Sequence, residues 1–161
     1  MRRTALAALC LLSLAGPASA ATDTTSVTVT ATVLASCDVS ANNLAFLNYD
    51  PISPTPRDVT TTIVVICTNG TGYDVGLNIG VGAGATYAAR RMTHAGQTLA
   101  YSLYSDGAHS IVWGEAIGVD AVHGTGSGAN QTLTVHGRIP AGQTAPAGGP
   151  YSDTITVTVT Y

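Results

Sequence analysis

Hydrophobic and polar residues alternate strictly in two segments of the chain. Residues 26–33 read SVTVTATV, and residues 154–161 read TITVTVTY. Because successive side chains of a strand point to opposite sides, each segment has one apolar row and one row rich in threonine. We therefore predict a strand in each segment. The apolar rows are Val27, Val29, Ala31 and Val33 in the first segment, and Ile155, Val157, Val159 and Tyr161 in the second.

The alternating pattern leads to different expectations for the strands that could pair with residues 26–33 and with residues 154–161. We expect the edge of the strand at 154–161 to be open to another strand, since no later residue of the sequence could cover it. For residues 26–33, the pattern alone leaves three interpretations: a strand of the same domain, a disordered tail, or a strand that pairs with another molecule. An edge that pairs between molecules would make assembly the function.

Further strands are predicted between these two segments. Residues 59–67 end in a continuous apolar run, which favours a strand buried on both sides. Alternating apolar residues predict strands at 73–79, 99–103 and 133–139, and a shorter strand is expected at 44–49. Strands at this spacing, without a helical period, predict an all-β sandwich or barrel.

The remaining segments predict turns and loops. A turn at 105–107 followed by apolar residues at 111–113 predicts a hairpin with the strand at 99–103. Glycine, proline and alanine predominate at 140–150, which indicates a connection before the last strand. Loops are also expected around residues 88–97 and 121–130.

The first 20 residues predict a secretory signal peptide. Arg2 and Arg3 precede an apolar run, and Ala18–Ala20 has the small-residue pattern of a cleavage site. The run is shorter than the roughly 20 residues that a membrane-spanning helix needs. Cys10 lies inside it and is interpreted as a leader residue, not a lipid attachment point. The mature chain is expected to start at Ala21.

Cys37 and Cys67 are the two cysteines that remain after the leader. An even pair in an exported protein predicts one disulfide, which should stabilise the domain by about 3 to 4 kcal/mol. A zinc site is the less favoured alternative. Structural zinc sites use four Cys or His ligands at close spacing, and no histidine lies near either cysteine.

The charge and the polar residues exclude several functions. The net charge is −3, and it becomes −5 without Arg2 and Arg3; the chain has no lysine. Nucleic acid is therefore not expected as a partner, because phosphate binding needs a basic patch. The four histidines are scattered, no GxSxG motif occurs, and Glu115 is the single glutamate. We predict no catalytic residues, no metal and no cofactor, and hence not an enzyme.

Five parts of the sequence, in their order and spacing, resemble spore coat protein U domains, the subunits of Csu-type archaic chaperone–usher pili. The resemblance covers essentially all of the mature chain. The parts are Val27–Cys37, Cys67, Tyr101–Asp106, His136–Pro140 and Gly149–Val159.

The resemblance implies an incomplete immunoglobulin-like sandwich that lacks its last strand and has an N-terminal donor strand extension. In this family a periplasmic chaperone fills the resulting groove until the donor strand of the next subunit replaces it during export through an outer-membrane usher. This implies a signal peptide at 1–20, a donor strand at 21–34 and a pilin domain at 35–161. Val27, Val29, Ala31 and Val33 would be the donor residues, and Ile155, Val157 and Val159 would line the acceptor groove.

The function implied by the resemblance is that of a structural pilus subunit, exported through the periplasm to the cell surface, with roles in adhesion and biofilm formation. Its partners would be neighbouring pilin subunits, the chaperone and the usher. Two alternatives remain open. One is a spore or cell-surface coat or matrix protein of the same fold, and the other is a carbohydrate-binding β-sandwich, which Trp113 and the tyrosines favour.

Overall fold

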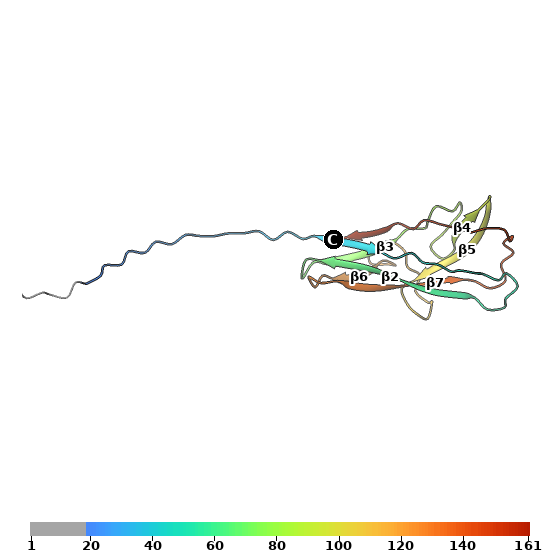
Figure 1. Ribbon diagram of the computed structural model, residues 1–161, viewed down its shortest axis with the longest axis horizontal. Coiled ribbons are helices and arrows are strands. Elements are labelled where there is room, and N and C mark those ends of the chain that lie inside the picture. The colour runs from blue at the N-terminus through green and yellow to red at the C-terminus, as the bar shows by residue number, and fades with distance from the viewer. Residues whose placement is uncertain (1–18) are drawn as a thin grey trace, which may run out of the picture. The chain divides into compact units, whose positions relative to one another are not determined.

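The computed structural model describes residues 19–161 (Figure 1). The predicted signal peptide lies, apart from its last two residues, outside the described residues, and so does Cys10. A compact unit comprises residues 33–161, and the described residues before it, 19–32, lie outside that unit. In the described part of the chain, no helix is long and apolar enough to cross a membrane.

Residues 19–32 contain no strand. The prediction of a strand at 26–33 is therefore not met in a single chain, because a strand requires hydrogen bonds to a neighbouring strand. The side chains of Val27 and Val29 are 83% and 88% exposed. The segment thus keeps its apolar row accessible to solvent.

The described residues of the compact unit form eight strands in two antiparallel sheets, which confirms the all-β sandwich. The five-stranded sheet has the order β1-β2-β7-β5-β4, and the three-stranded sheet has the order β6-β3-β8. Figure 1 shows the β4–β5 hairpin at the end of this unit away from β6. The strands are β1 (Cys37–Ala41), β2 (Arg57–Cys67), β3 (Gly72–Leu77), β4 (Arg90–His94), β5 (Gln97–Tyr104), β6 (Val122–Thr125), β7 (Gln131–Ile139) and β8 (Val157–Thr160).

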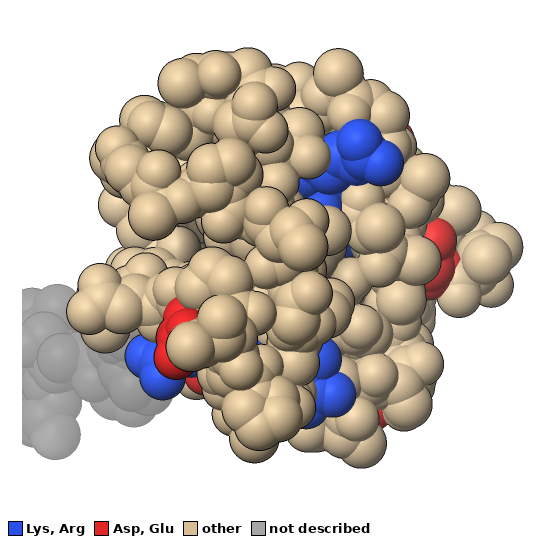
Figure 2. All heavy atoms as spheres, turned by 90° about the vertical axis from the view of Figure 1, so that its right-hand side faces the viewer, with Lys and Arg blue, Asp and Glu red and all other residues tan. Residues whose placement is uncertain are grey.

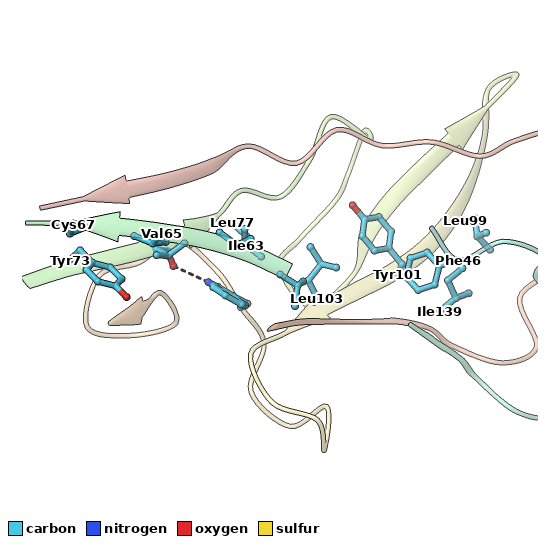
Figure 3. Packing of buried hydrophobic residues seen from close by; sticks show 13 residues of the cluster. Phe46, Ile63, Val65, Cys67, Tyr73, Leu77, Leu99, Tyr101, Leu103 and Ile139 are labelled. Carbon is cyan, nitrogen blue, oxygen red and sulfur yellow. Dashed lines mark hydrogen bonds between the residues drawn. The ribbon is translucent and has the colours of Figure 1, made fainter. Parts of the chain in front are cut away.

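The core lies between the sheets and is built from alternate residues of the strands (Figure 3). In β2, Ile63, Val65 and Cys67 are buried, whereas Ile66 is 38% exposed. The prediction that this part of β2 is buried on both sides is therefore wrong, since one face of its sheet meets solvent. The other buried apolar residues are Phe46, Tyr73, Val75, Leu77, Leu99, Tyr101, Leu103, Trp113, Val135 and Ile139.

Two predicted elements differ from the observed structure. Residues 44–49 form no strand, because Leu47 adopts a φ of 57° and interrupts the extended backbone. The predicted hairpin of 99–103 with 111–113 is reduced to one bridge, between Tyr104 and Val112.

Two predicted loops contain strands instead. Residues 88–97 contain β4, which pairs with β5 through a turn at Ala95 and Gly96, both with positive φ. Residues 121–130 contain β6, which pairs with β3. Both strands have few apolar residues and no clear alternation. Their pairing partners, not their own patterns, define them.

A buried arginine joins the sheets at one end. Arg90, in β4, is 0% exposed, and its guanidinium donates hydrogen bonds of 2.6 to 3.0 Å to the backbone carbonyls of Leu77, Asn78, Tyr87 and Trp113. Burial lowers the pKa of this group, but the four carbonyls accept hydrogen bonds from four of its five N–H donors. Arg90 thereby fixes the end of β3 to β4.

Candidate functional site

A groove of about 440 Å³ opens between the two sheets. One wall is formed by residues 41–44, which include the end of β1, and the other by residues 151–155 and Val157, which lead into β8. Side chains of the hydrophobic core form its floor. The floor residues are Phe46, Ile63, Leu77, Tyr101, Leu103 and Val135. The sandwich is thus open between an edge strand of each sheet.

The outer edge of β8 carries unpaired backbone groups toward this opening. The N–H of Asn78 donates to the carbonyl of Thr156 (3.2 Å), and the N–H of Thr156 donates to Oδ1 of Asn78 (2.9 Å). Backbone groups of alternate residues in an antiparallel strand point to opposite edges. Since Thr156 faces the β3 side, the backbone groups of Ile155, Val157 and Val159 face the outer edge.

The outer edge of β1 is arranged in the same way. The N–H of Thr68 donates to the carbonyl of Ser36 (2.9 Å), and the N–H of Asn42 donates to the carbonyl of Thr62 (3.0 Å). Even-numbered residues of this segment therefore face β2, and the odd-numbered residues of β1 face its outer edge. β1 is the edge strand of its sheet and β8 is an edge strand of the other sheet, and the two strands lie close together, so the domain presents two strand edges near each other.

The predicted acceptor residues all lie on the β8 side of the domain. Ile155, Val157 and Val159 are partly buried and pack against the core. Ile155 and Val157 line the groove, whereas Val159 lies opposite Val75 of β3, beyond the groove lining. The structure thus brings two of the three residues to the groove.

The disulfide predicted between Cys37 and Cys67 is present. It joins the first residue of β1 to the last residue of β2, and the two Cα atoms are 4.1 Å apart. Because β1 is short and has strand neighbours on one side only, the bond keeps it against β2 and so maintains one side of the groove.

The predicted donor residues carry an exposed apolar row. Val27, Val29, Ala31 and Val33 are all exposed, and Val33 is 82% exposed.

Sequence reasoning missed a polar anchor at one end of the groove. The hydroxyl of Tyr101 donates to Oδ2 of Asp153 (2.8 Å), and the N–H of Val81 donates to Oδ1 (2.8 Å). Burial and the hydrogen bond to Asp153 raise the pKa of Tyr101, so the phenol stays protonated. Gly80 lies beside this carboxylate with a φ of 84°, a conformation that favours glycine, and a Cβ there would contact the carboxylate of Asp153. The partners of Asp153 are 52 and 72 residues away in sequence, so no local signal marks it.

Other candidate chemistry of the sequence is dispersed. Among residues 19–161, no three His, Cys, Asp or Glu side chains gather so that they could hold a metal ion. Trp113 is 1% exposed and donates its indole N–H to the carbonyl of Val75 (2.8 Å; dashed in Figure 3), so its ring is not available to stack on a sugar. On the face in Figure 2, charged side chains lie in small separate groups on a mostly uncharged surface.

A family model described as the Spore Coat Protein U domain matches residues 23–158. Direct comparison with curated protein sequences finds no match.

Two solved structures are similar to the chain. One is the CsuC–CsuE chaperone–tip adhesion subunit pre-assembly complex from archaic chaperone–usher Csu pili of Acinetobacter baumannii, with a TM-score of 0.61 and 21% identity over 81% of this chain and 41% of that chain. The other is the E. coli Hda pilus minor tip subunit HdaB, with a TM-score of 0.40 and 18% identity over 77% of this chain and 79% of that chain. The chain thus spans about two fifths of the length of the first. That likeness shows the fold, an immunoglobulin-like sandwich of two sheets.

Proposed function

Because the chain belongs to the spore coat protein U domain family, we propose that it is a structural subunit of an archaic chaperone–usher pilus that polymerises by donor-strand complementation. The observation that carries this proposal is the groove that lies between the end of β1 and the start of β8. Its floor is the domain's own core, and two strand edges flank it. Such a groove fits one extended segment, which would gain backbone hydrogen bonds along the edges and side-chain contacts below.

The proposed occupant is the donor strand at 21–34 of a neighbouring subunit, which completes the pilin domain at 35–161. Val27, Val29, Ala31 and Val33 would point into the groove, beside Ile155, Val157 and Val159 of the acceptor. Burial of three valines and one alanine contributes roughly 5 to 8 kcal/mol before the backbone hydrogen bonds are counted. Because donor and acceptor surfaces differ, the contact is heterologous and produces an open filament.

The same groove requires a temporary occupant before assembly. A periplasmic chaperone would fill it and an outer-membrane usher would export the subunit to the cell surface, where the pilus serves adhesion and biofilm formation. The family's description favours a second candidate, a coat or matrix protein that uses the same groove.

The test adds the missing strand to the chain itself. A second copy of residues 22–33, joined after Tyr161 by a flexible linker, should raise the midpoint of thermal unfolding and prevent polymerisation. The matched control carries the same extension with Val29→Asp in the added copy, and it should gain no stability. Equal midpoints for the fused and unfused chains would contradict a missing strand.

A further inference from the structure

The chain carries a groove and, in the proposed function, the segment that fills such grooves, so self-closure would compete with assembly. The donor segment leads directly into β1, one of the two strands that flank the groove. We propose that the Ser36–Thr68 junction prevents each subunit from filling its own groove, so that the occupant is the donor segment of a second copy. This inference rests on the proposed function.

The junction holds the backbone in front of β1 by several contacts. The hydroxyl of Thr68 accepts a hydrogen bond from the N–H of Ser36 (3.2 Å), and it lies 3.4 Å and 3.3 Å from the carbonyl oxygens of Leu34 and Ser36, to either of which it can donate. The N–H of Thr68 donates to the carbonyl of Ser36 (2.9 Å). The adjacent disulfide between Cys37 and Cys67 fixes the next pair covalently. Ser36 therefore continues β1 along β2.

Self-closure would require the donor segment to turn back along the free edge of β1 as an antiparallel hairpin. Residues directly opposite each other in such a pair share one face of the sheet. The core-facing residues of β1, Cys37 and Val39, are odd-numbered, and so are the donor residues. All four donor residues can reach the groove only with Val33 opposite Cys37. A shift by two residues places Ala31 opposite Cys37 and removes Val33 from the row. Val33 then lies in a loop of residues 33–35, which contains no Gly or Asn.

The register with Val33 opposite Cys37 leaves too little chain for a turn while the junction is intact. With Ser36 in place, Leu34 would lie opposite it, and Ala35 alone would have to reverse the chain. Hairpin loops need two residues or more. A two-residue turn of Leu34 and Ala35 would shift the register by one residue and point the donor row away from the groove.

Release of Ser36 does not produce a favourable turn. The loop would then be Leu34-Ala35-Ser36, and it would lose the contacts of Ser36 with Thr68. Three-residue hairpin loops place one residue in the left-handed region, which favours Gly or Asn, and none of these three is either. The junction therefore disfavours the closed monomer without affecting a donor segment that arrives from another subunit.

The test lengthens the junction and asks whether the chain closes on itself. Insertion of Asn-Gly between Leu34 and Ala35 supplies a three-residue loop, Asn-Gly-Ala, with Ser36 retained. The matched control has Asn-Gly inserted between Ala21 and Thr22, ahead of the donor row. Each full mature chain is refolded with its disulfide intact, and then analysed by gel filtration and by titration with a labelled peptide of residues 22–33.

The junction insertion is expected to give monomers that bind the peptide about a hundredfold more weakly than the control, because a tethered strand competes at an effective concentration near millimolar. If the insertion chain polymerises and binds the peptide as the control does, the inference is wrong although the groove still accepts a strand. If the unaltered chain does not bind the peptide either, the proposed function fails and the inference with it.

A second pair of variants examines Thr68 directly. Thr68→Val removes the hydroxyl and should increase the fraction of closed monomer during refolding, whereas Thr68→Ser keeps the hydroxyl and should not. Equal fractions of monomer in the two variants would overturn the role of Thr68.

Discussion

Residues 26–33 and residues 154–161 share almost the same alternation of valine and threonine, yet only the second segment contains a strand, β8. The two segments differ in whether a neighbouring strand pairs with them. β8 pairs with β3 over four residues, and its apolar row packs against the core. The first segment forms no strand and exposes the same kind of row. Alternation thus determines which side chains can face a core, and a partner strand determines whether the strand forms.

The largest effects should come from the same substitution in the two segments. Val157→Asp places a charge in β8 against the hydrophobic core of the domain and should lower the free energy of unfolding by about 3 kcal/mol or more. Val29→Asp should leave that free energy unchanged, since Val29 is exposed, but abolish polymers. Chemical denaturation and gel filtration measure the two results. Thr30→Asp, on the opposite row, is the control, and polymers of normal length from Val29→Asp would refute its donor role.

The next largest effect concerns β3, the strand with which β8 pairs. Arg90→Met would leave the carbonyls at the end of β3, those of Leu77 and Asn78, without their donors. We expect the free energy of unfolding to fall by about 3 kcal/mol, as measured by urea denaturation. Arg91→Met is the control, because its guanidinium makes one contact, of 3.5 Å. Similar losses in both variants would contradict a specific role of Arg90.

A smaller effect on the free energy of unfolding should appear in alkaline solution. It concerns the hydrogen bond between Tyr101 and Asp153, in the groove wall that precedes β8. The pKa of Tyr101 is raised, mainly by burial and then by Asp153, so the folded state holds this proton more tightly than the unfolded state. The resulting stability is complete below the ordinary tyrosine pKa of about 10 and is lost as the pH rises above it. Tyr101→Phe should therefore flatten the fall of unfolding free energy above that pH. Parallel pH profiles would show that Tyr101 does not contribute.

The smallest effect should come from a pair outside both segments. Arg138 donates two hydrogen bonds, of 2.7 and 2.6 Å, to the carboxylate of Asp58, and this lowers the pKa of Asp58. Because the pair is partly exposed, Arg138→Met should cost only about 0.5 kcal/mol at neutral pH. The difference should vanish in acid, as Asp58 is protonated in both proteins, and thermal unfolding at several pH values measures it. A difference that persists in acid would assign it to packing instead.

Much of the fold was predictable where one strand's pattern is sufficient. The alternating residues of β3, β5 and β7 and the pair of cysteines predicted three core strands and the disulfide correctly. β4 and β6 were not predictable, because pairing with β5 and β3 defines them. The loop at 44–49 was not predictable either, because its apolar residues suggest a strand, whereas the positive φ of Leu47 interrupts the extended backbone.

The residues of the candidate site also fall into a group that the sequence predicted and a group that it did not. The apolar row of Ile155 and Val157 was visible in the sequence, and the family resemblance implied that this row lies at the groove. Asp153 and the Ser36–Thr68 junction were not predicted, since their contacts join residues 32 or more positions apart. Ordinary serine, threonine and aspartate residues give no local sign of such contacts.

The position of the disulfide has a mechanical consequence. In a filament assembled as proposed, a pull on one subunit's donor segment first meets the hydrogen bonds between Ser36 and Thr68 and then the disulfide at Cys37. The covalent bond passes that load directly to the end of β2, which pairs with β7 over nine residues, and not only to the five-residue edge strand β1. Tension would then act in shear on the hydrogen bonds between β2 and β7, and it would not pull the short strand β1 away from its sheet.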